Sequence, residues 1–154
     1  MDQRQLPADF KDFIRYLNKN EVCYLLVGGW ALGIYGHPRA TKDIDFLVAL
    51  DAENLDKLQQ TLVDFGAPSL DLEKFKENGS VYRMGRPPIQ IDIINNADGI
   101  DIYDCFPRRK IIQVDGIEVS LISREDFIKN KKTSCRLQDL ADIENLTCPS
   151  RREE

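Results

Sequence analysis

The sequence has little of what several common functional sites require. His37 is its only histidine, and its four cysteines, at positions 23, 105, 135 and 148, show no C-x-x-C spacing. A structural zinc site and a histidine-centred catalytic triad therefore both lack their parts. No apolar run approaches the length that crosses a membrane, and the N-terminus lacks a secretory hydrophobic segment. We therefore expect a cytoplasmic protein with no membrane partner and no disulfide framework.

The chain also lacks an excess of positive charge. Its 21 lysines and arginines are outnumbered by 26 aspartates and glutamates, which gives a formal net charge of −5. This balance argues against attraction of the whole surface to nucleic acid or to an anionic membrane. A local basic groove remains compatible with it, and the candidates are residues 108–110 and 129–132. Short basic runs are, however, more often solvated faces.

What is present suffices for one ordinary domain, since 154 residues with 42% hydrophobic content can bury a core. Apolar residues at helical spacing predict a helix around residues 10–17, and Asp51 is a suitable N-cap for another that Gly66 ends. Strands are expected over residues 21–27, 44–50, 81–84, 89–94, 111–114 and 117–121, the last two joined by a hairpin at Asp115 and Gly116. We predict a single α+β domain, a mixed β-sheet packed against helices, over residues 1–148, followed by a polar tail over residues 149–154.

Two motifs stand close together in the first third of the chain. Gly28 and Gly29 end one apolar run, and Asp43 and Asp45 open the next. In a strand these two aspartates project from the same face, where their charges repel unless divalent cations such as a pair of Mg²⁺ ions balance them. Glycines let backbone N–H groups approach phosphate oxygens closely, at the start of a short helix expected near residues 30–35. The pairing predicts a site for phosphate and metal.

A third carboxylate lies in the apolar stretch at residues 88–95. Ile89, Ile91 and Ile93 would form one face of a strand and leave Asp92 on the other. A charge there is costly unless it is paired, metal-bound or at the edge of the sheet. If this strand lies beside that of Asp43, three carboxylates converge. The alternative is an exposed aspartate on an edge strand.

Other residues near these motifs allow two interpretations each. Arg39 would hold a triphosphate oxygen or form a salt bridge with one of the neighbouring aspartates, and Thr41 would orient the loop by hydrogen bonding. Trp30 would stack on a nucleotide base or, more commonly for a tryptophan at a helix start, belong to the core.

Taken together, these residues resemble the nucleotidyltransferase superfamily related to DNA polymerase beta. The likeness is greatest to its small bacterial members related to abortive-infection toxins and lincosamide nucleotidyltransferases. It rests on the glycine pair, on the Arg39-x-Thr41-x-Asp43-x-Asp45 run, on Asp92, and on closing segments at residues 123–131 and 136–143. Matched islands extend from about Val22 to Leu146. Two positions depart from the pattern: many members have Gly-Ser in place of the glycine pair, and Cys135 stands where a glycine is expected.

The resemblance implies a nucleotidyltransferase-type mixed sheet and a role for each matched residue. Asp43, Asp45 and Asp92 would be the catalytic metal ligands, and Mg²⁺ or Mn²⁺ would be the cofactor. The NTP would be bound by Gly28, Gly29, Arg39, Thr41 and Lys131. For Lys131 the alternative is a simply solvated side chain.

The expected reaction is metal-dependent transfer of a nucleoside monophosphate from an NTP to a hydroxyl or phosphate acceptor, with release of pyrophosphate. The acceptor stays open between a small molecule, tRNA and protein. Since little chain lies outside the expected catalytic core, either the acceptor is small or a protein partner or second copy helps to bind it. Two other readings are a glycosyltransferase, which also uses Asp-x-Asp, and a catalytically weak interaction module such as an antitoxin or partner subunit.

Overall fold

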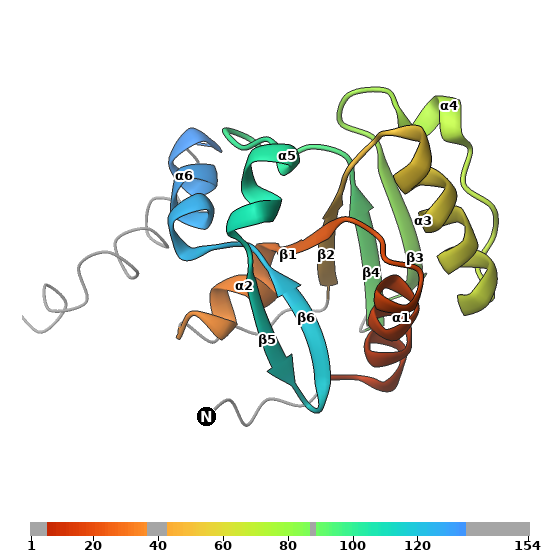
Figure 1. Ribbon diagram of the computed structural model, residues 1–154, viewed down its shortest axis with the longest axis horizontal. Helices are drawn as coiled ribbons and strands as arrows, with labels where there is room; N and C mark the ends of the chain where they lie inside the picture. The colour runs from red at the N-terminus through yellow and green to blue at the C-terminus, as the bar shows by residue number, and fades with distance from the viewer. Residues whose placement is uncertain (1–5, 37–42, 87–88, 135–154) are drawn as a thin grey trace, which may run out of the picture.

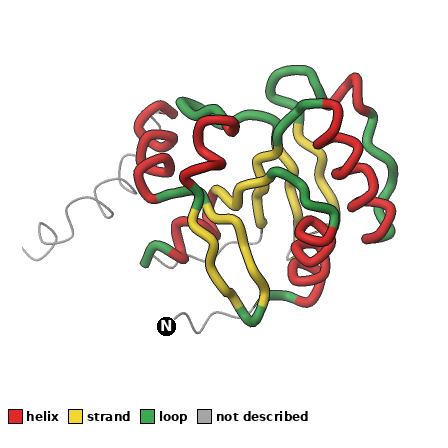
Figure 2. Tube along the Cα trace, viewed as in Figure 1, coloured by secondary structure: helices red, strands yellow, loops and turns green. Residues whose placement is uncertain are grey.

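A six-stranded mixed sheet forms the centre of the molecule, with helices packed around it (Figures 1 and 2). The computed structural model describes residues 6–36, 43–86 and 89–134. The elements in chain order are α1 (Ala8–Lys19), β1 (Tyr24–Val27), α2 (Gly28–Ile34), β2 (Asp43–Val48), α3 (Ala52–Phe65), α4 (Leu72–Phe75), β3 (Val81–Arg86), β4 (Ile89–Ile94), α5 (Ile102–Cys105), the 3-10 turn η1 (Phe106–Arg108), β5 (Lys110–Val114), β6 (Ile117–Leu121) and α6 (Arg124–Ser134).

The strand order is β3-β4-β2-β1-β6-β5. The pairs β1/β2, β3/β4 and β5/β6 are antiparallel, whereas β2/β4 and β1/β6 are parallel. The predicted α+β architecture with a mixed sheet is therefore confirmed. The strand that carries Asp92, β4, lies between β2 and β3, so the interpretation of Asp92 as an edge-strand residue is wrong.

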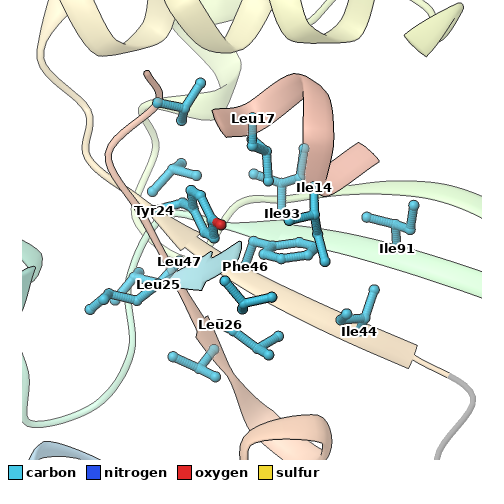
Figure 3. Close-up of a cluster of buried hydrophobic side chains, with 14 of the residues drawn as sticks. Ile14, Leu17, Tyr24, Leu25, Leu26, Ile44, Phe46, Leu47, Ile91 and Ile93 are labelled. Atoms are coloured by element: carbon cyan, nitrogen blue, oxygen red, sulfur yellow. The ribbon is translucent and has the colours of Figure 1, made fainter. Parts of the chain in front are cut away.

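One face of the sheet is apolar and supports the core. The strand registers place Leu26, Phe46 and Ile93 side by side on β1, β2 and β4, and all three are buried (Figure 3). Helix α1 covers this face: the Phe13 ring centroid lies 5.6 Å from that of Phe46 and 5.2 Å from that of Phe65 on α3. Because side chains alternate along a strand, the aspartates of β2 and β4 emerge on the opposite face.

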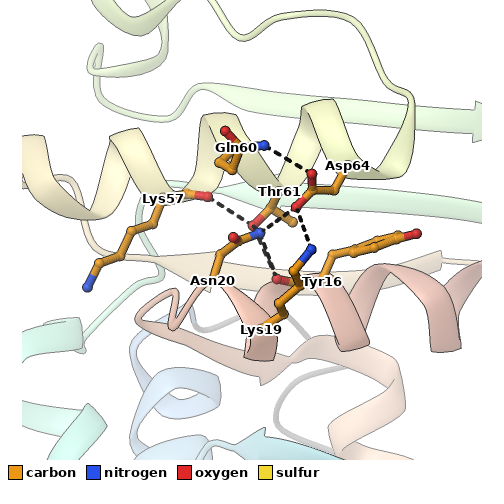
Figure 4. A network of polar contacts seen from close by, with 7 residues as sticks. All are labelled: Tyr16, Lys19, Asn20, Lys57, Gln60, Thr61 and Asp64. Carbon is orange, nitrogen blue, oxygen red and sulfur yellow. Dashed lines mark hydrogen bonds and ion pairs between the residues drawn. The ribbon is translucent and has the colours of Figure 1, made fainter.

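The two helices on the core face are also joined by polar contacts (Figure 4). After the end of α1, the amide nitrogen of Asn20 lies 3.1 Å from the Thr61 hydroxyl and 3.0 Å from an oxygen of Asp64, both on α3. Lys19 adds a looser ion pair to Asp64 at 3.8 Å. These contacts join the C-terminal end of α1 to α3.

Local capping signals in the sequence are confirmed at several element boundaries. The Asp51 side chain accepts a hydrogen bond from the backbone N–H of Asn54 at the start of α3, and Gly66 ends that helix in the left-handed conformation. The hairpin between β5 and β6 turns at Asp115 and Gly116, with φ of 52° and 80°. Residues 70–78, which carry no clear sequence pattern, contain the short helix α4, capped by Asp71.

Helix α6, the last helix of the described residues, is attached to the segment that follows β4. Arg108 forms a 3.0 Å ion pair with Asp126, and the Asn130 side chain donates a hydrogen bond to the backbone carbonyl of Asp98. The helix expected from residue 136 and the polar tail over residues 149–154 lie outside the described residues. Within the part of the chain that is described, no helix has both the length and the apolar content to cross a membrane.

Candidate active site

The glycine pair lies where β1 passes directly into α2. The helix begins at Gly28, two residues earlier than the sequence predicted, and Gly28 has a φ of +72°. A Cβ atom at this position would collide with Oδ2 of Asp45 and lie only 3.1 Å from its Cγ. The carboxylate of Asp45 therefore rests against the backbone at the start of α2, which requires a residue without a side chain.

The three predicted aspartates share one region of the sheet. Asp45 is the register partner of Asp92 across the parallel β2/β4 pair, and it is also the partner of Val27 at the end of β1. Asp43 lies two residues before Asp45 on the same strand and therefore on the same face. The structure thus confirms that the Asp92 strand lies beside the Asp43 strand and brings the three residues together.

The charges of this group act on one another. The pKa of Asp45 is raised to about 6, first by burial and then by the negative charges of Asp92 and Asp43, whereas the positive charges of Lys131 and Arg83 oppose the rise. A partly buried carboxylate held next to two others is electrostatically unfavourable when no cation is bound. This region of the sheet therefore has a built-in preference for positive charge.

Asp92 has a partner that the sequence did not predict. Arg83, its register partner on β3, donates from Nε to Oδ1 at 2.9 Å and from a terminal nitrogen to Oδ2 at 3.2 Å. The Gln90 amide lies 3.4 and 3.5 Å from the same two oxygens. The Asp92 side chain is only 7% exposed, whereas that of Arg83 is 60% exposed. A buried charge is therefore balanced by a side chain that reaches in from the surface.

A pocket of about 240 Å³ opens beside Asp45. The pocket lies between the start of α2, the segment that follows β4, and helix α6. Three of the predicted residues line it: Gly28, Asp45 and Lys131. Gly29, Asp43 and Asp92 do not line it. The polar residues Asn96, Asp98 and Asn130, which no sequence motif marks, complete the lining with Val27, Ile94 and Ala97.

The donor set suits a hard divalent cation, because all three converging side chains are carboxylates. In the present arrangement, however, no three acidic, histidine or cysteine side chains among the described residues are grouped so that they could hold a metal ion. Both oxygens of Asp92 are instead hydrogen-bonded to Arg83.

The remaining candidates divide into two groups. Trp30 is buried and packs edge-on against Phe10, with ring centroids 5.9 Å apart, so it belongs to the core. Arg39 and Thr41 lie outside the described residues, and their expected contacts with nucleotide stay predictions.

A family model described as a nucleotidyltransferase of unknown function (DUF6036) matches residues 5–149. The chain belongs to this family. The match covers both glycines and all three aspartates, and it confirms the resemblance to nucleotidyltransferases inferred from the motifs. Among curated proteins, none matches the chain.

Solved structures agree with the nucleotidyltransferase fold. A Thermotoga maritima protein provisionally assigned as a nucleotidyltransferase is 13% identical with a TM-score of 0.56, and the match covers 100% of both chains. The lincosamide antibiotic adenylyltransferase LnuA, solved with lincomycin bound, is 16% identical with a TM-score of 0.53 and covers 95% of this chain and 99% of its own. The antibiotic-resistance factor ANT(2'')-Ia is 14% identical with a TM-score of 0.55, and the match covers 93% of this chain and 82% of that protein's chain. At these identities the likeness concerns the fold.

Proposed function

We propose that this protein transfers a nucleoside monophosphate from an NTP to a hydroxyl or phosphate acceptor in a reaction that depends on Mg²⁺ or Mn²⁺. The acceptor oxygen attacks the α-phosphorus and, where it belongs to a hydroxyl, gives up its proton to Asp92 or to solvent. The bond from that phosphorus to the bridging oxygen of the β-phosphate breaks, and pyrophosphate leaves with the electron pair. Family membership favours this reaction over the glycosyltransferase alternative.

The observation that carries the proposal is the position of Asp45. It lies beside Asp92 across the parallel strands and against the backbone of Gly28, and it lines the same pocket as Lys131. Carboxylates that can bind metal, backbone N–H groups that can bind phosphate and a lysine that can balance negative charge are thus adjacent. A triphosphate with bound metal requires these three kinds of group.

Each residue then has a distinct task. Asp43 and Asp45 would hold the cation or cations, whose charge would neutralise the triphosphate and lower the barrier to attack. Asp92, which does not line the pocket, would help to bind the catalytic metal and activate the acceptor. The backbone at Gly28 and Gly29 and the Lys131 ammonium orient the phosphates, with Arg39 and Thr41 contributing from the residues that precede β2 in the sequence.

The test is a transfer screen with α-labelled NTPs and Mg²⁺ or Mn²⁺, in which pyrophosphate is measured as well as labelled product. Acceptors should include tRNA, protein, aminoglycosides and lincosamides, because the last two suit a small acceptor site. We expect Asp43→Asn and Asp45→Asn to abolish transfer and Asp92→Asn to lower turnover more than NTP binding. The control Asp51→Asn keeps a competent helix cap and should retain activity. Transfer that survives in both the Asp43 and Asp45 variants would exclude this site.

One observation favours a second function, a catalytically weak interaction module with the same fold. The ion pair with Arg83 satisfies Asp92 without any metal, as expected if the carboxylate served structure alone. Titration of the protein with an NTP in the presence and absence of Mn²⁺ separates the two functions. Metal-dependent NTP binding supports the transferase, whereas no binding under either condition supports the module.

A further inference from the structure

Arg83 has an unusual position for the partner of a buried carboxylate. It lies on β3, the edge strand of the sheet, directly beside Asp92 in the antiparallel register. Among the described residues its backbone has a neighbouring strand on one side only, and its side chain is 60% exposed. The charge of Asp92 is thus neutralised by a side chain that can leave toward solvent without disturbing the core.

The proposed function uses the carboxylate of Asp92 as a metal ligand. Arg83 and a divalent metal ion would therefore compete for it. Arg83 meets both oxygens in a fork, and the Gln90 amide adds weaker contacts to each. A divalent ion bound by Asp92 would lie within a few ångströms of the guanidinium, where two positive charges repel. An ion bound between Asp45 and Asp92 would therefore compete with Arg83 in its present geometry.

We propose that Arg83 is the counter-ion of the metal-free site, and that a divalent cation displaces it from Asp92 when the site is loaded. The inference rests on the proposed function, because it uses Asp92 as a metal ligand. Leaving a buried carboxylate unpaired beside Asp45 and Asp43 would be strongly unfavourable, so the empty site needs a positive charge of its own. Arg83 supplies that charge, and it lowers the affinity of the site for metal because it competes for Asp92.

The test compares Mn²⁺ binding in the parent protein and in Arg83→Met, by titration calorimetry and by the paramagnetic resonance of free Mn²⁺. Methionine keeps much of the apolar stem and removes the charge. We expect Mn²⁺ to bind about tenfold more tightly, the scale of one lost charge-assisted hydrogen-bonded pair. In EDTA the variant should melt about 2–4 °C lower than the parent, and its rise in melting temperature on adding Mn²⁺ should be larger.

Arg86→Met is the matched control. Arg86 is exposed on the same strand, and three residues of separation place it on the opposite face. The Arg86→Met variant removes a positive charge from the same edge strand but not from Asp92, so its Mn²⁺ affinity should equal that of the parent. Arg83→Lys keeps the charge but loses the two-pronged geometry, and it should bind Mn²⁺ a few-fold more tightly. This variant carries the test if Arg83→Met shows no folding transition.

Equal or weaker Mn²⁺ binding in the Arg83 variants would overturn the proposal. Weaker binding would mean that Arg83 orients Asp92 for the metal. Equal binding would mean that Arg83 and Mn²⁺ do not compete for Asp92. If the parent and every variant bind no Mn²⁺, the metal site itself is wrong and the proposed function fails with it. If the parent binds Mn²⁺ and the variants match it, only the role of Arg83 is refuted.

Discussion

Replacing Asp45 with asparagine should stabilise the metal-free protein, and the gain should depend on pH. The pKa of this carboxyl is about 6 in the folded protein against an ordinary value of 3.8, because of burial and the adjacent Asp92 and Asp43. Below pH 3.8 the group is protonated in both the folded and unfolded states. Between pH 3.8 and 6 the folded state alone keeps the proton, so the free energy of unfolding falls as the pH rises. Above pH 6 the full penalty is present.

The size of the effect follows from the shift. A difference of about two pKa units corresponds to about 3 kcal/mol, at 1.36 kcal/mol per unit. Asparagine has nearly the same shape and cannot ionise, so Asp45→Asn should recover much of this energy at pH 7. For a domain of this size the melting temperature should rise on the order of 5–10 °C.

The assay is thermal and denaturant unfolding in EDTA between pH 3.5 and pH 8, followed by circular dichroism. The stability difference between Asp45→Asn and the parent should be near zero at pH 3.5 and reach its maximum above pH 6. Asp56→Asn, on the exposed side of α3, provides a control outside the carboxylate group. A variant that is no more stable than the parent at pH 7, or a gain of equal size at pH 3.5, would refute the proposed repulsion.

Three other substitutions test separate parts of the structure. Gly28→Ala should lose about 1–3 kcal/mol more stability than Gly66→Ala, since both have positive φ but only Gly28 faces a carboxylate; chemical denaturation measures the difference. Lys131→Met should weaken metal-dependent NTP binding about tenfold in a fluorescence titration with a labelled NTP, because it removes the cation beside Asp45. Asn54→Ala should cost about 3 kcal/mol in calorimetry, because the buried side chain bonds three backbone groups flanking β1 and β2.

The sequence could predict those parts of the site that follow from local periodicity. Alternation along a strand placed Asp43 and Asp45 on one face, and the glycine pair marked a tight turn into a helix. The start of that helix was misplaced by two residues because no capping side chain marks it: Val27 occupies the N-cap position. The need for a residue without a side chain at position 28 comes from the nearby Asp45 carboxylate, which is a tertiary contact.

Residues brought in from other elements were not predictable in the same way. Arg83 has no fixed sequence spacing to Asp92, and the two meet only through the antiparallel β3/β4 register. The sequence feature that could have predicted this contact is the hairpin between β3 and β4. A hairpin that pairs Arg86 with Ile89 also pairs Arg83 with Asp92. The pocket residue Asn130 belongs to a helix whose placement depends on contacts with the segment after β4.

The most direct measurement of the central claim is a crystal structure with Mn²⁺ and a non-hydrolysable NTP, with the metal located by its anomalous scattering. We expect the metal on the carboxylates of Asp43, Asp45 and Asp92, the triphosphate against the backbone at Gly28, and the Arg83 guanidinium away from Asp92. Metal and nucleotide bound elsewhere, for example in the hollow of about 430 Å³ between the end of α3 and β3, with these three aspartates unligated, would contradict it.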